Sequence, residues 1–102
     1  MDKAKNASEP SLDSTIRVNE QVVFRKLEAE GILVRLDTTE YFGLDSLGIR
    51  IWSLLEQGRS LPEVLQELLK EYECDEQRCR EDLLQFVGRL ADHGLVFVGE
   101  AF

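Results

Sequence analysis

The sequence contains few of the residues that build covalent or metal-based sites. Of its 102 residues, two are cysteines, one is histidine and two are prolines. Cys74, Cys79 and the distant His93 form neither paired Cys-x-x-Cys elements nor a four-ligand set, so we expect no metal site. The spacing of the two cysteines would allow a disulfide, but in a reducing compartment we expect two free thiols.

Basic residues and long apolar runs are also scarce. Twelve Lys and Arg stand against 20 Asp and Glu, which gives a formal charge of -8 and a pI near 4.6. Nucleic-acid affinity depends on Lys and Arg contacts to phosphate, so this charge argues against a nucleic-acid partner. No apolar run approaches the roughly 20 residues of a membrane span, and residues 1–10 lack the apolar core of a signal peptide. We therefore expect a cytoplasmic protein without a membrane partner.

No recognisable catalytic arrangement is present. The sequence shows no nucleophile paired with a base, and its glycines are too scattered to form a phosphate-binding loop. His93 is expected to interact with the C-terminal end of the last helix rather than to catalyse a reaction. The many carboxylates of the last two helices are typical of solvated faces. The sequence therefore predicts no enzyme, no catalytic residue and no cofactor.

The composition is that of one small folded domain with a tail. Hydrophobic residues make up 43% of the chain, enough for one modest core. Residues 1–15 are mostly polar and are predicted to be a flexible N-terminal tail. Residues 16–102 are predicted to form the domain.

Three short strands are predicted in the first half of the domain. Residues 22–27 and 32–36 are β-prone, and a returning strand begins at Tyr41 and Phe42. In the second strand, the alternation of Ile32, Val34 and Leu36 predicts that one face is buried. Gly31 fits a turn that needs a positive φ, and residues 37–40 form a second polar turn. The third strand is expected at the edge of an antiparallel meander.

Three helices are predicted to follow the strands. Asp45 is expected to cap the first helix, and Gly58 to end it. Ser60-Leu-Pro-Glu63 has the pattern of a capping box for the second helix. The third helix is expected from near Asp75 to just before Gly94, followed by a short extended segment at residues 95–98. Trp52 is predicted to be a core residue. The resulting fold class is α+β, a winged helix-turn-helix-like body with a three-stranded antiparallel sheet followed by three helices.

Three segments together resemble the PqqD family. They are Tyr41-Phe-Gly-Leu-Asp45, Leu47-Gly-Ile-Arg-Ile-Trp52 and Leu90-Ala-Asp-His-Gly-Leu95. PqqD proteins act in pyrroloquinoline quinone synthesis, and their relatives are called RiPP recognition elements because they act on ribosomally made precursor peptides. The resemblance extends from about residue 18 to residue 98.

The resemblance implies a non-catalytic peptide chaperone. In this family the leader segment of a precursor peptide adds a strand beside the third strand, in a groove next to the third helix. The protein then presents the precursor to a maturation enzyme, which for PqqD itself is a radical S-adenosylmethionine enzyme. The residues that this implies for peptide binding in this chain are Thr39, Glu40, Tyr41, Phe42, Gly43, Arg78, Asp82, Gln85, Phe86 and Arg89.

Two other classes of function remain open at this point. One is an acidic winged-helix DNA-binding regulator, and the other is a small scaffold or dimerising adaptor without a peptide ligand. Residues 60–93 hold nine acidic and four basic residues, a net charge of -5, which argues against DNA binding. A precursor gene beside a maturase gene would favour the peptide chaperone.

Overall fold

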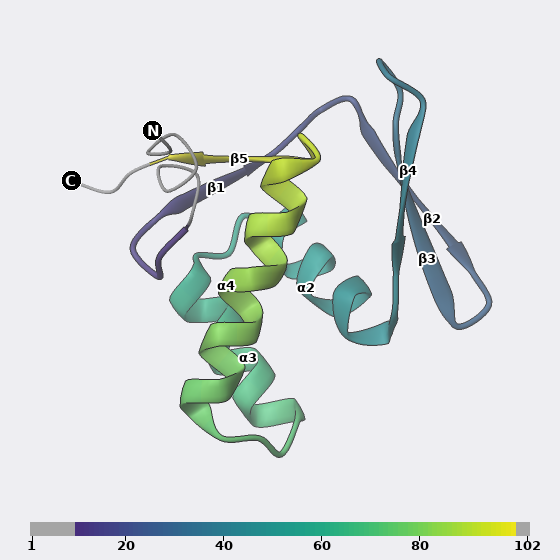
Figure 1. Cartoon of the computed structure of the whole chain (residues 1–102). Helices are drawn as coiled ribbons and strands as arrows, with labels where there is room; N and C mark the ends of the chain where they lie inside the picture. The colour runs from purple at the N-terminus through teal and green to yellow at the C-terminus, as the bar shows by residue number, and fades with distance from the viewer. Residues whose placement is uncertain (1–9, 100–102) are drawn as a thin grey trace.

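The computed structural model describes residues 10–99, which form a small α+β domain (Figure 1). In chain order the elements are β1 (Thr15–Val18), β2 (Val22–Leu27), β3 (Glu30–Arg35), β4 (Glu40–Leu44), α2 (Ser46–Glu56), α3 (Leu61–Glu71), α4 (Glu76–Asp92) and β5 (Val96–Gly99). The predicted fold class, with three strands followed by three helices, is confirmed. The predicted tail falls mostly outside the described residues, although Leu12 in its described part packs against the core.

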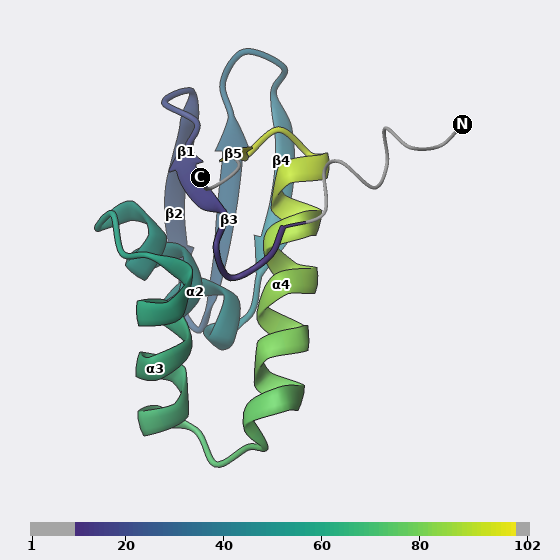
Figure 2. The same cartoon turned by 90° about the vertical axis from the view of Figure 1, so that its left-hand side faces the viewer.

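The strands β2, β3 and β4 form an antiparallel sheet in that order, so β4 is an edge strand as predicted. Figure 2 shows the three strands side by side, with α4 on the β4 side of the sheet. The turn between β2 and β3 places Glu28, not Gly31, at positive φ. Gly31 is part of β3, where a Cβ would lie 2.6 Å from the Phe24 ring and 2.9 Å from Ile49. The prediction that Gly31 serves the turn was wrong, because this glycine is needed for close packing.

The buried face of β3 is the opposite of the predicted one. Leu33 is fully buried, whereas Ile32 and Val34 are half-buried and Leu36 is 55% exposed. The strand contains apolar residues on both faces, so alternation alone did not identify the inner one. The helices cover the face that carries Leu33, and the face that carries Ile32 and Val34 lies on the other side of the sheet.

A second, two-stranded sheet joins the two ends of the domain. The predicted extended segment at residues 95–98 forms β5, which pairs antiparallel with β1, a strand that sequence reasoning missed. Asn19 follows β1 and is buried. Its Nδ2 donates to the Gly94 carbonyl at 2.8 Å, its Oδ1 accepts from the Gln21 N–H at 2.8 Å, and its own N–H donates to the Leu95 carbonyl at 3.0 Å. Asn19 therefore connects the start of the sheet to the end of α4.

The helix boundaries follow the predicted capping residues. The Asp45 carboxylate accepts from the Gly48 N–H at 2.8 Å, and Ser60 and Glu63 form a reciprocal capping box. Asp75 caps α4, and Gly58 adopts a φ of +83° just beyond α2. Each of these residues satisfies backbone groups locally, which explains why the sequence predicted the helix ends well.

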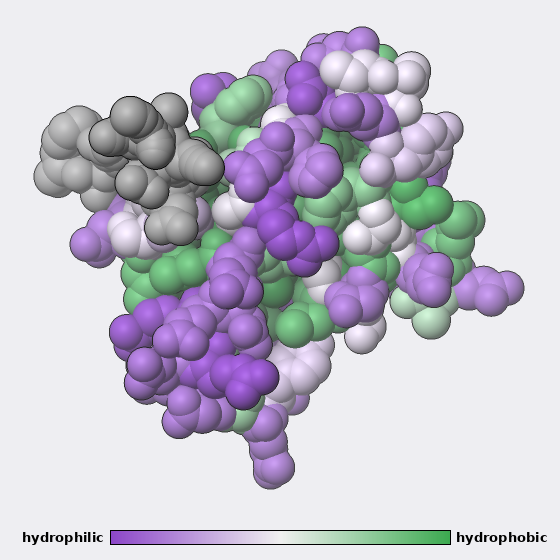
Figure 3. Space-filling model, in the orientation of Figure 1, coloured by the Kyte–Doolittle hydropathy of each residue, from purple (hydrophilic) through white to green (hydrophobic). Residues whose placement is uncertain are grey.

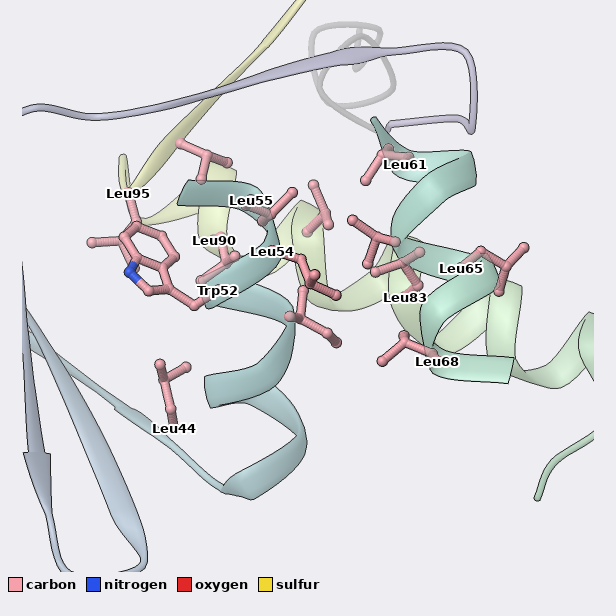
Figure 4. Close-up of a cluster of buried hydrophobic side chains, with 14 of the residues drawn as sticks. Leu44, Trp52, Leu54, Leu55, Leu61, Leu65, Leu68, Leu83, Leu90 and Leu95 are labelled. Carbon is pink, nitrogen blue, oxygen red and sulfur yellow. The ribbon is translucent and has the colours of Figure 1, made fainter. Parts of the chain in front are cut away.

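The core lies between the helices and the inner face of the sheet. Trp52 is 1% exposed and belongs to the core, as predicted, and the same cluster includes leucines of α2, α3 and α4. In Figure 4 its indole lies near Leu90 and Leu95. Its Nε1 is buried without a hydrogen-bond partner. On the surface, Arg50 of α2 forms a 2.7 Å ion pair with Glu71 of α3. The helices therefore form one packed body beside the sheet.

Candidate functional site

The outer edge of β4 has free backbone hydrogen-bonding groups. The Leu36 N–H donates to the Gln21 carbonyl, so these two opposite residues form a hydrogen-bonded pair. Hydrogen-bonded pairs alternate along an antiparallel ladder, so the backbone groups of Ile32 and Val34 also bond to β2. Gly31, Leu33 and Arg35 therefore bond to β4, through Leu44, Phe42 and Glu40. The N–H and C=O groups of Tyr41 and Gly43 consequently point away from the sheet. These two residues can accept an added strand.

An apolar groove opens beside this edge, between the end of β4 and the three helices. Its volume is about 480 Å³. The groove is lined by Gly43, Leu44, Asp45, Leu47, Gly48, Ile51, Leu68, Tyr72, Cys74, Cys79, Asp82, Leu83, Phe86 and Arg89. Figure 3 shows apolar surface between the polar ridge of α4 and the sheet. Apolar side chains of a bound peptide could be buried here.

The floor of the groove depends on Gly48 in the first turn of α2. A Cβ on this residue would lie 3.2 Å from the Leu44 side chain and 3.3 Å from the ring of Phe86. The missing side chain lets α2 approach α4 closely at this point. Leu47, the neighbouring residue, is 38% exposed and faces the groove instead of the core.

Polar and aromatic contacts hold β4 against the C-terminal end of α4. The Phe42 ring meets the His93 ring edge-on, with centroids 5.0 Å apart, and the Arg89 guanidinium lies 5.5 Å from the centre of the Phe42 ring. Arg35 donates to the His93 carbonyl at 3.0 Å and forms a bidentate ion pair with Asp37. Hydrogen bonding to Arg35 lowers the pKa of Asp37 below its ordinary value. These contacts fix the position of the edge strand relative to α4.

The structure brings only part of the predicted peptide-binding set to the groove. Gly43, Asp82, Phe86 and Arg89 line it, and Phe42 contacts Arg89 at one end. Arg78 lies outside the groove, within 3.8 Å of Asp82, and Gln85 is exposed on α4. Thr39 belongs to the turn, with a φ of +60°, and Glu40 is the first residue of β4.

Sequence reasoning missed several residues that line the groove. They are Leu44, Leu47, Leu68, Tyr72 and both cysteines. Apolar side chains such as these fit a core position and a groove wall equally well, so the sequence holds no signal that separates the two. On the third helix, Asp82, Phe86 and Arg89 line the groove whereas Arg78 and Gln85 do not. The sequence fixes which residues share a helix face, but it fixes the rotation of that face toward the groove only roughly.

Tyr41 lies on the opposite face of the sheet from the groove. Its side chain is 73% exposed, and it lines a shallow hollow of about 440 Å³ together with Glu30, Ile32, Gly43 and Asp45. A Cβ on Gly43 would have no atom within 4 Å, so this part of the hollow is open. The edge of β4 therefore has an apolar groove on one face and a shallow hollow on the other.

The two cysteines are free thiols that both line the groove. Burial, and to a smaller extent the Cys74 thiol, raises the pKa of Cys79 to about 11. Within residues 10–99 no group of three or more His, Cys, Asp or Glu side chains is placed to hold a metal ion. In the same part of the chain, no helix is both long and apolar enough to cross a membrane.

Comparisons with known proteins show a matching family and a similar solved structure. Residues 30–96 match the family model for coenzyme PQQ synthesis protein D (PqqD). The structure of TbiB1 in complex with the TbiA(beta) leader peptide is similar, with 38% sequence identity and a TM-score of 0.75, over 78% of this chain and 93% of TbiB1. No curated protein sequence matches this chain significantly.

A second solved structure shares the fold. Lasso peptide synthetase B1, complexed with the leader peptide, is 23% identical with a TM-score of 0.75, over 81% of this chain and 98% of that protein. The family match spans more than half of the chain and includes β3, β4, α2, α3 and α4. This chain therefore belongs to the PqqD family.

Proposed function

We propose that this protein is a non-catalytic recognition element that binds the leader segment of a ribosomally made precursor peptide. The leader adds a strand to β4 and places its inward side chains in the groove. The protein then presents the precursor to a maturation enzyme in the cytoplasm. The observation that carries this proposal is the free edge of β4, where Tyr41 and Gly43 offer unpaired backbone groups beside an apolar groove.

The similar proteins support this proposal. TbiB1, which is 38% identical to this chain, was solved in complex with the TbiA(beta) leader peptide. Lasso peptide synthetase B1, which has the same fold, was also solved with a leader peptide. Strand addition needs only free backbone groups at a sheet edge and a surface that receives the side chains, and β4 and the groove supply both.

Calorimetry with the leader of the precursor encoded beside this gene tests the proposal. We expect binding of one leader per protein, with a dissociation constant of roughly nanomolar to micromolar size, as for interfaces of modest area. The TbiA(beta) leader is a second probe. If neither leader produces heat or shifts backbone amide signals at about 100-fold excess over the protein, the proposal fails.

A pair of proline variants tests strand addition itself. Gly43→Pro removes an N–H that points to the free edge, so the fold should survive and leader binding should be lost. Phe42→Pro removes an N–H that bonds to β3, so this variant should lose the sheet. Gly43→Ala keeps the N–H and only adds a methyl group on the outer face, so it should weaken leader binding much less than Gly43→Pro does. Full leader affinity in a folded Gly43→Pro variant would exclude strand addition at β4.

A further inference from the structure

The two faces of β4 differ in what an added strand would meet. Successive side chains of a strand point to opposite faces, so an added strand must place every second side chain on the outer face of the sheet. Phe42 and Leu44 face the helices, and Tyr41 and Gly43 face outward. An added strand therefore brings half of its side chains to the hollow beside Tyr41 rather than to the groove.

The outer hollow has the shape of a side-chain site. The Tyr41 ring stands at one side of it, and Ile32, the cross-strand partner of Gly43, lies opposite the open position. Because residue 43 has no side chain, a peptide residue that faces it can lie over Ile32 without a clash. Tyr41 is the most exposed of the large apolar and aromatic side chains within residues 10–99.

The charges around the hollow restrict which side chain fits. Glu30 and Asp45 both line it, and no Lys or Arg does. The aliphatic stem of a long basic side chain can lie on Ile32 and the Tyr41 ring while its cationic end meets Glu30. Glu30 would repel an acidic side chain here, because Arg25, which pairs with Ile32 on the same face of the sheet, does not line the hollow.

We propose that the leader is read on both faces of the sheet, and that one of its outward-facing residues, a lysine or arginine, occupies the hollow beside Tyr41. This inference rests on the proposed function, since it assumes that a leader strand pairs with β4. It adds a second point of recognition outside the groove, with its own chemical preference. Tyr41 contacts the leader directly through this hollow.

Double-mutant cycles test the inference. The leader of the neighbouring precursor is made in two variants, with alanine at alternate positions of the segment that pairs with β4. One variant removes the inward side chains and the other removes the outward ones. Each is titrated against the parent protein, Tyr41→Ala, Leu47→Ala and Phe97→Ala. Leu47 lines the groove, and Phe97, 44% exposed on β5, is a matched aromatic control outside both sites.

We expect Tyr41→Ala to weaken binding of the natural leader by about 2- to 5-fold, the range of an aromatic cross-strand contact. The same change should have no effect on the leader that lacks outward side chains. Leu47→Ala should weaken binding of the natural leader but have no effect on the leader that lacks inward side chains. Phe97→Ala should change the affinity of none of the leaders. If Leu47 couples to the inward side chains but Tyr41 does not couple to the outward ones, the inference is wrong and the proposed function stands. Loss of all binding by the parent protein would instead reject the proposed function.

Two further arms examine the charge preference and a rival occupant. Glu30→Gln should weaken binding of a leader with a basic outward residue, whereas Glu28→Gln, at an exposed turn residue outside the hollow, should not. Equal effects of the two substitutions would contradict the basic preference. If Tyr41→Ala leaves leader affinity unchanged but slows processing by the maturation enzyme, the hollow contacts that enzyme and the inference is wrong.

Discussion

Arg35 and His93 are 58 positions apart in the sequence, yet the Arg35 guanidinium donates to the His93 carbonyl at 3.0 Å. This bond joins the end of β3 to the C-cap of α4 and so fixes the edge strand beside the groove. Gly94, the next residue, has a φ of +71°, and a Cβ there would collide with the same guanidinium. The Arg35 side chain thus fills the space in which a side chain at position 94 would otherwise lie.

Gly94→Ala should destabilise the protein more than Gly58→Ala. Both residues have positive φ, which costs an alanine about 1–2 kcal/mol of folding free energy. Gly58 has open space around its Cβ position, so it reports the backbone strain alone, whereas alanine at 94 must also displace Arg35. Urea unfolding measures both free energies. In an Arg35→Ala background the two costs should become equal, and a persistent difference would contradict this explanation.

Trp52→Ala should cost roughly 3–5 kcal/mol of stability, a large share for a domain of this size. The side chain is 1% exposed and belongs to the core cluster, so its removal leaves a cavity. Trp52→Phe is the matched control. It should cost clearly less, because it keeps most of the apolar contact and removes an Nε1–H that has no partner. Thermal unfolding of both variants checks this order, and equal losses would contradict it.

Thiol labelling should distinguish the two cysteines. Cys74 is exposed and should react with Ellman's reagent within the mixing phase at about pH 8, whereas the buried thiol of Cys79, with a pKa near 11, should react slowly. Cys74→Ser should abolish the fast phase. Two equally fast thiols in the folded protein would contradict the burial of Cys79.

The raised pKa of Cys79 also predicts a loss of stability at alkaline pH. The folded protein holds this proton more tightly than the unfolded chain, in which the thiol titrates near its ordinary value of 9.0. The stabilisation is therefore complete below about pH 9, and it should decline as the pH rises toward 11. Cys79→Ala should flatten the pH dependence of the unfolding free energy in this range.

The protein should not bind duplex DNA at about 150 mM salt. The net charge of -8 leaves too few cations for phosphate contacts, and α4 exposes Glu76, Glu81 and Asp82. Fluorescence anisotropy with duplexes from the gene's own promoter region measures this. Saturable binding would support the winged-helix regulator instead of the peptide chaperone.

The sequence by itself determined α2, α3 and α4 with their ends, and the strands β2, β3 and β4. Asp45, Ser60, Asp75 and Gly58 act through hydrogen bonds or backbone angles within a few residues, so local reasoning found the helices. The order β2, β3, β4 followed from short turns between neighbouring strands, and it already placed β4 at an edge. The family resemblance supplied the expectation of a peptide ligand.

Only the tertiary structure decided which side chains meet across the site. Several contacts join residues that are far apart in the chain, and the sequence around each residue holds no local signal of them. They are the pairing of β1 with β5, the hydrogen bond from Asn19 to the Gly94 carbonyl and the hydrogen bond from Arg35 to the His93 carbonyl. The same holds for Leu47 and Tyr72, whose apolar character fits the core and the groove equally well. Whether such a residue is covered depends on how α2, α3 and α4 pack against one another. That packing is set by the whole core together.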